Sequence, residues 1–86
     1  MNLLMSVDEA ERVMELLINN ACSINECPYC GFRVAYCDGN WTNQHSPIVR
    51  VYADRIEAGY YCGKSGKEVI LLTIDRRSGG VTEVYG

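Results

Sequence analysis

The sequence predicts an α+β domain in which one N-terminal helix packs on a four- to five-stranded antiparallel sheet. Three features predict this class: a helical repeat of apolar residues near the N-terminus, several short segments rich in β-branched and aromatic residues after it, and turn signals between those segments. The chain has 86 residues, a length that suits one hydrophobic core. We therefore expect residues 1–86 to form a single domain.

The helix is predicted over residues 7–21, where apolar side chains recur at spacings of three and four. Ser6 and Glu9 have the capping-box pattern, in which each side chain bonds the backbone N–H of the other residue. Asp8, Glu9 and Glu11 also place negative charge near the positive end of the helix dipole. These features predict where the helix begins.

The rest of the chain has the patterns of strands and turns. A strand is expected over residues 32–37, because Phe, Val and Tyr alternate with other residues there. Segment 39–47 is polar and is predicted to be a loop. Segment 68–75 is almost continuously apolar, which predicts a central strand buried on both faces. The other expected strands are 48–53, 56–62 and 81–85.

The charge and hydropathy of the chain exclude several classes of partner. The formal net charge of −3 argues against a nucleic-acid partner bound through many phosphates. No segment approaches the roughly 20 apolar residues that span a bilayer, and Met1 to Met5 lacks the basic start of a signal peptide. We expect a cytoplasmic protein with no membrane partner. No catalytic arrangement and no site for a small-molecule substrate is evident.

The five cysteines carry the most chemical information. Five is an odd number, and a Cys-x-x-Cys pair in a chain expected to be cytosolic points to metal or redox chemistry rather than to a disulfide framework. Cys27 and Cys30 form such a pair, and the glycine that follows suits a metal-binding knuckle. Cys22 is expected to be a core residue at the helix end, and His45 an exposed imidazole in a polar loop.

A second segment, Cys62-Gly63-Lys64-Ser65-Gly66, matches the first knuckle except that serine replaces its second cysteine. Together the two segments resemble a zinc ribbon with one ligand missing. The resemblance implies a zinc ion, and we predict the ligand set Cys27, Cys30, Cys62 and Cys37, with His45 as the alternative fourth ligand. It also leaves open a nucleic-acid-binding module that uses the basic residues Arg50, Arg55, Lys64, Lys67, Arg76 and Arg77.

The first motif, Cys-Pro-Tyr-Cys, is also similar to the active-site motif of glutaredoxins. That resemblance implies a thiol-disulfide oxidoreductase that uses Cys27 and Cys30, with Cys27 as a low-pKa thiolate that attacks disulfides. In glutaredoxins the motif opens a helix, whereas here a predicted helix precedes it. The redox enzyme is therefore the alternative to a metal site.

The closing segment, residues 68–85, looks like the final hairpin of small bacterial immunity proteins and PepSY-like inhibitory domains. This resemblance implies a role in binding another protein. A small acidic domain without catalytic groups can act by covering a basic surface of a partner. We predict a non-enzymatic inhibitor or regulator that binds its protein partner through the residues Asp8, Glu11, Glu15 and Trp41.

Overall fold

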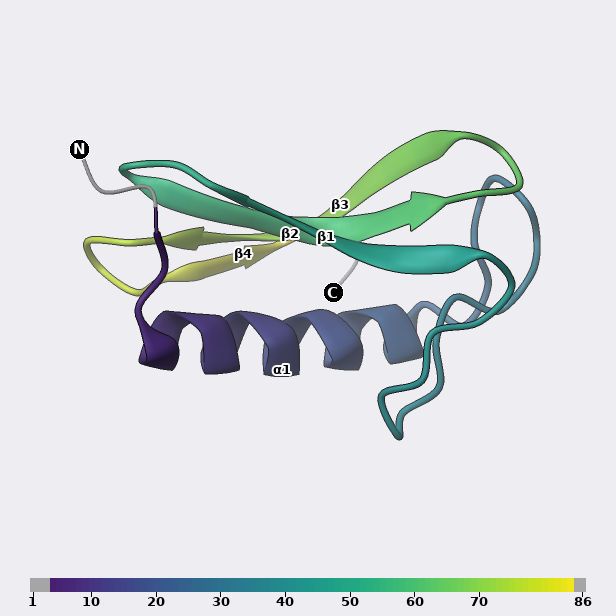
Figure 1. Cartoon of the computed structure of the whole chain (residues 1–86), viewed down its shortest axis with the longest axis horizontal. Coiled ribbons are helices and arrows are strands. Elements are labelled where there is room, and N and C mark those ends of the chain that lie inside the picture. Colours follow the sequence, from purple (N-terminus) through teal and green to yellow (C-terminus); the bar gives the residue numbers. More distant parts are fainter. Residues whose placement is uncertain (1–3, 85–86) are drawn as a thin grey trace.

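The structure is a computed structural model that describes residues 4–84. One helix is followed by four strands, namely α1 (Val7–Ser23), β1 (His45–Val51), β2 (Arg55–Cys62), β3 (Lys67–Asp75) and β4 (Val81–Glu83). The strands form one antiparallel sheet in the order β1-β2-β3-β4, and α1 lies along one face of it (Figure 1). This arrangement confirms the predicted α+β class, with four strands.

The predicted capping box begins α1. The Ser6 hydroxyl accepts the Glu9 N–H at 3.1 Å, and the Glu9 carboxylate accepts the Ser6 N–H at 3.0 Å. The helix continues two residues beyond the predicted end, to Ser23. Its buried apolar side chains, Val13, Leu17 and Ala21, lie four positions apart and pack in the same core as the buried residues of β2 and β3.

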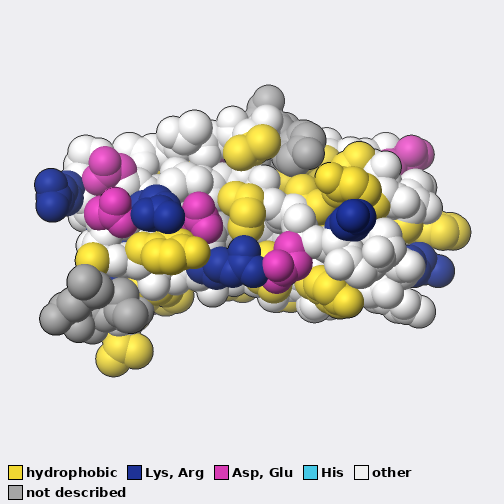
Figure 2. Space-filling model, turned by 90° about the horizontal axis from the view of Figure 1, so that it is seen from above, with side chains coloured by type: hydrophobic (Ala, Val, Ile, Leu, Met, Phe, Trp, Pro, Cys, Tyr) yellow, Lys and Arg dark blue, Asp and Glu magenta, His cyan; other side chains and the backbone are white. Residues whose placement is uncertain are grey.

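Strand β3 contains a β-bulge that changes which of its side chains reach the core. Its register with β2 shifts between Ala58 and Gly59, which leaves Leu71 as an extra residue on β3. Because of this bulge, Leu71 and Leu72 are both fully buried in the core although they are consecutive. The predicted burial on both faces is wrong: within residues 4–84, only α1 packs as a regular element against the sheet, and it covers one face. Figure 2 shows the opposite face, where charged and apolar side chains are open to solvent.

Two other expectations fail in the segment between α1 and the sheet. Residues 32–37 form no regular strand; they contribute only isolated bridges, Glu26 to Arg33 and Ala35 to Trp41. Neither bridge continues into a ladder, so this segment lacks the paired neighbouring strand that a regular strand needs. The predicted loop over 39–47 ends early, because β1 begins at His45. The last strand ends at Glu83, and Tyr85 of the predicted strand lies outside the described residues.

The segment from residue 24 to residue 44 lies at the end of the sheet where β2 turns into β3, away from the first residues of α1 (Figure 1). The start of β1 and the end of β2 meet at the same place, since His45 and Cys62 are register partners. Within the described chain, no helix has the length and hydropathy needed to cross a membrane.

Candidate metal centre

Four potential metal ligands meet at this end of the sheet: Cys27, Cys30, His45 and Cys62. Their ligand atoms all lie within 4.8 Å of one another. Adjacent sulfurs around a tetrahedral zinc ion lie about 3.8 Å apart, as follows from Zn–S bonds of about 2.3 Å. Cys27, His45 and Cys62 are buried, and Cys30 is half-buried. The cluster therefore has the size and the chemistry to hold a metal ion.

The first two ligands are held by a tight turn that follows α1. The Gly31 N–H donates to the Cys27 carbonyl at 2.8 Å, and the Cys27 N–H donates to the Phe32 carbonyl at 2.8 Å. Gly31 has φ +79°, a conformation that other residues rarely adopt. The turn directs the backbone N–H groups of Tyr29 and Cys30 at the Cys27 sulfur. This is the knuckle that the Cys-x-x-Cys-Gly motif predicts.

The turn between β2 and β3 repeats this geometry. The Gly66 N–H donates to the Cys62 carbonyl at 2.8 Å, and Gly66 has φ +72°. Ser65 occupies the place that Cys30 has in the first knuckle, and its backbone N–H and hydroxyl both bond the Cys62 sulfur. The second knuckle thus supplies one ligand, and its serine supports that ligand.

His45 completes the cluster and corrects a prediction. It is only 5% exposed, not an exposed imidazole, because β1 places it directly opposite Cys62. Its Nδ1 lies 2.8 Å from the Thr42 carbonyl oxygen, which can only accept, so Nδ1 carries the proton. Nε2 is therefore the free nitrogen, and it lies 3.4 Å from the Cys30 sulfur. A hydrogen bond of this kind orients a histidine for metal binding.

The surroundings favour charged sulfur at two of the three cysteines. Burial would raise the pKa of Cys62, but the hydrogen bonds from Ser65 and from the Cys30 and Cys27 thiols lower it to about 6. Burial acts in the same direction on Cys27, whose pKa is nevertheless lowered by the hydroxyl of Tyr60, 3.2 Å away, and by backbone N–H groups. Burial and the two neighbouring sulfurs raise the pKa of Cys30. Thiolates are the form that binds metal.

Three of the four predicted ligands are brought together, and the fourth is not. Cys37 lies outside the cluster and forms a disulfide with Cys22, with the two Cα atoms 5.1 Å apart. His45 takes the fourth place. Val49 and Val51 follow His45 at even spacings and pack against the core, and that alternation is the sequence signal that would have put His45 on the core face of a strand.

The residues predicted to bind a protein partner lie in two environments. Asp8, Glu11 and Glu15 are exposed on α1. Trp41 is half-buried and packs against the core. In the described chain no helix begins at Cys27, where glutaredoxins have one, in agreement with the helix order expected from the sequence.

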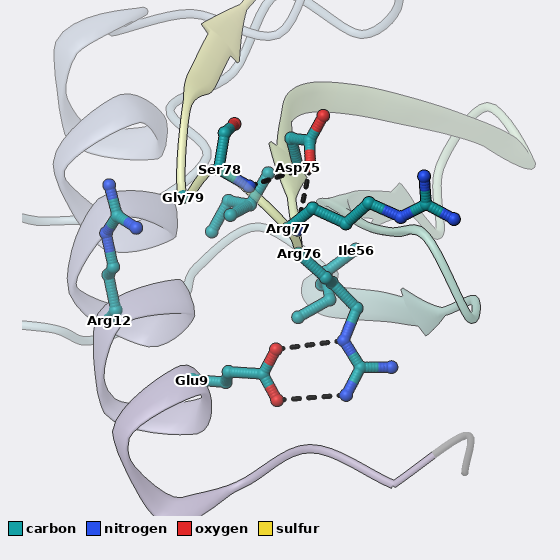
Figure 3. A pocket seen from close by; sticks show the side chains of 9 residues that line it. Glu9, Arg12, Ile56, Asp75, Arg76, Arg77, Ser78 and Gly79 are labelled. Atoms are coloured by element: carbon teal, nitrogen blue, oxygen red, sulfur yellow. Dashed lines mark hydrogen bonds and ion pairs between the residues drawn. The ribbon is translucent and has the colours of Figure 1, made fainter. Parts of the chain in front are cut away.

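A pocket of about 280 Å³ lies at the other end of the molecule, between α1 and the turn from β3 to β4 (Figure 3). The Arg76 guanidinium donates to both carboxylate oxygens of Glu9, at 2.9 and 3.0 Å. The Asp75 carboxylate accepts the N–H groups of Arg77 and Ser78. The Glu9–Arg76 pair therefore links the helix to the turn, and the Asp75 bonds hold the turn itself.

Comparisons of the chain with protein-family models, with curated proteins and with solved structures find no match. The geometry of the cluster is therefore the main guide to function.

Proposed function

We propose that the protein is a zinc-stabilised, non-enzymatic binding module in which Cys27, Cys30, His45 and Cys62 hold one Zn²⁺. The observation that carries the proposal is the approach of all four ligand atoms to within 4.8 Å of one another. Three sulfurs and one imidazole nitrogen form one of the usual ligand sets of structural zinc sites. Hard cations such as Mg²⁺ and Ca²⁺ prefer oxygen ligands, so this donor set disfavours them.

The site is better suited to a structural ion than to a catalytic one. A catalytic zinc usually has three protein ligands and leaves one position for water or substrate. Here four protein ligands are available, and three of them are buried. A zinc ion bound by all four would have no open position.

The ion would supply stability that the chain otherwise lacks between α1 and β1. Residues 24–44 contain no helix or strand, and their regular pairing is limited to two isolated bridges. Small domains often depend on a metal or disulfides for this reason. The Zn²⁺ would tie the first knuckle to β1 and to the turn after β2, with the disulfide between Cys22 and Cys37 adding a second link.

The role as an inhibitor or regulator of another protein also remains a proposal. The observation that supports it is the exposed acidic side of α1, formed by Asp8, Glu11 and Glu15. Charged residues on such a surface mainly affect the rate and specificity of association. A charge-reversal variant of the three residues should slow binding to a basic partner without changing the zinc content.

Native mass spectrometry of protein purified without added metal tests the zinc centre. We expect one zinc per chain in the wild type, and none in C62S or H45A. S46A is the matched control, because Ser46 adjoins His45 on β1 yet is exposed and is not among the clustered ligands; it should keep its zinc. Purified protein with no zinc and a disulfide between Cys27 and Cys30 would contradict the proposal and favour the redox enzyme.

A further inference from the structure

The disulfide and the metal cluster act on the same stretch of chain. Cys22 lies in the last turn of α1, and Cys37 follows it 15 positions later in the sequence. The loop that the disulfide closes contains Cys27 and Cys30, two of the four residues of the metal cluster. Both cross-links therefore restrict the first knuckle, one through the helix and one through the sheet.

The disulfide is open to solvent on one side. Cys37 is exposed, whereas Cys22 is half-buried. Cys37 lies in a tight turn, in which the Tyr36 N–H donates to the Asn40 carbonyl at 2.9 Å and the Gly39 N–H donates to the Tyr36 carbonyl at 3.0 Å. Exposed disulfides are the ones that exchange readily, because an attacking thiolate has to reach one of the two sulfurs. A small thiol can therefore reach the Cys37 sulfur.

The other cysteines are less available for exchange. Cys27 and Cys62 are buried and Cys30 is half-buried, and all three would be ligands in the zinc-loaded protein. The chain has five cysteines, so Cys22 and Cys37 are the two that the ion leaves free. Thiol exchange in the zinc-loaded protein should therefore take place first at this pair.

We propose that Cys22 and Cys37 form a reversible redox site for small thiols of the glutathione type, and that the state of this site sets how tightly the cluster holds Zn²⁺. The proposal rests on the zinc centre proposed above. In the reducing direction, a glutathione thiolate attacks the Cys37 sulfur, the bond between the two cysteines breaks, and Cys22 leaves as a thiolate that takes up a proton. A second glutathione thiolate attacks the glutathione sulfur of the mixed disulfide and releases Cys37. Two glutathione thiols thus become one glutathione disulfide, and the protein gains two electrons and two protons; oxidation by glutathione disulfide is the reverse.

The coupling between the two sites follows from the small amount of regular structure in the segment that they share. Residues 24–44 contain no helix or strand and pair only through two isolated bridges. In the zinc-free chain, the disulfide removes many of the conformations that this segment could otherwise adopt. Less conformational entropy is then lost when zinc binds. Zinc binding and disulfide formation should therefore favour each other.

The length of the loop sets the size of the coupling. For cysteines 15 positions apart, the entropy of loop closure corresponds to at most about 100-fold in an equilibrium constant. We therefore expect the disulfide form to bind zinc about 10- to 100-fold more tightly than the reduced form. The coupling is reciprocal, so zinc must lower the reduction potential of the disulfide by the same factor. For a two-electron couple this is a shift of about 30–60 mV.

Two titrations of the full chain test this proposal. In the first, glutathione buffers of defined potential equilibrate the protein with and without zinc, and alkylation followed by peptide mass mapping reports which cysteines are paired. In the second, a chromophoric chelator competes for zinc with the disulfide form, with wild type reduced by a phosphine, and with C22A/C37A. S23A/Y36F is the matched control, because Ser23 and Tyr36 adjoin the two cysteines and are exposed. The reduced wild type serves in place of C22A/C37A if that variant does not fold.

We expect the disulfide between Cys22 and Cys37 to be reduced at a potential about 30–60 mV lower in the zinc-loaded protein than in the zinc-free protein. Reduced wild type and C22A/C37A should hold zinc about 10- to 100-fold more weakly than the disulfide form, and the control should stay within about twofold of the wild type. Equal zinc affinity in both states, or a disulfide that glutathione buffers cannot reduce, would overturn this inference alone, since zinc would still be bound. Protein that binds no zinc in either state would overturn the zinc centre and the coupling together. A disulfide between Cys27 and Cys30 that forms and breaks in place of the first pair would overturn both proposals and favour the redox enzyme.

Discussion

Gly59 is the position where one added methyl group should cost this fold most. A Cβ atom at residue 59 would lie 1.9 Å from the Val69 carbonyl oxygen and 2.8 Å from the Ile70 Cα. Both contacts are with backbone, so no side chain can turn aside. Gly59 lies at the bulge that allows β3 to bury Leu71 and Leu72 together. The variant G59A must therefore separate β2 from β3 by more than an ångström at the centre of the sheet.

The cost can be set against the stability of a domain of this size. Overpacking a core costs about 1–3 kcal/mol, and a clash with backbone belongs at the upper end of that range. A cost of about 3 kcal/mol lowers the melting temperature by about 12–24 °C in a domain of 60–100 residues. A domain of 86 residues has a total free energy of unfolding of about 4–13 kcal/mol. G59A should therefore keep only about 1–10 kcal/mol of unfolding free energy and melt about 12–24 °C below the wild type.

The assay is thermal and urea unfolding followed by far-ultraviolet circular dichroism, with zinc in excess. G80A is the matched control, because its added Cβ would meet only the flexible Ser78 side chain, at 3.2 Å. That variant should melt within a few degrees of the wild type, since replacing glycine also restricts the unfolded chain. A G59A protein that melts within about 4 °C of the wild type would show that the strands do not approach as described.

Three other predictions follow from the metal centre and from the ion pair at the far end of the molecule. Removing zinc with a chelator should unfold most of the chain at 25 °C, because structural zinc contributes about 10–16 kcal/mol, as much as the whole domain; an unchanged circular dichroism spectrum would contradict this. Y60F should lower zinc affinity about 10- to 100-fold in a competition with a chromophoric chelator, because it removes the hydroxyl 3.2 Å from the Cys27 sulfur, whereas Y61F should not. The hydrogen bonds from Arg76 and from the Ser6 N–H lower the pKa of Glu9 from 4.5 to about 2, so this carboxylate stabilises the fold above pH 4.5 and loses that effect as the pH falls toward 2. The difference in melting temperature between wild type and E9Q should be largest near pH 6 and vanish near pH 2; a constant difference would show that the ionised carboxylate is not its source.

Local patterns in the sequence were sufficient to predict the helix and most of the strands of the sheet. The capping box of Ser6 and Glu9 and the spacing of Val13 and Leu17 depend on residues within a few positions of one another, so they can be recognised without the fold. The strands at 55–62 and 67–75 were predicted to within one residue at each end. The strand predicted over 32–37 failed, because an alternating pattern does not form a strand without a paired neighbour.

The sequence by itself determined the secondary elements around the site, both knuckles and three of the four clustered residues, because a knuckle is a local turn of fixed spacing. Only the tertiary structure decided the fourth: the pairing of β1 with β2 sets His45 opposite Cys62, while the end of α1 brings Cys22 to Cys37. The register of β3 was decided in the same way, by the bulge at Leu71. These features depend on pairing between distant segments, and the free energy of that pairing comes from the whole core rather than from any one stretch of residues.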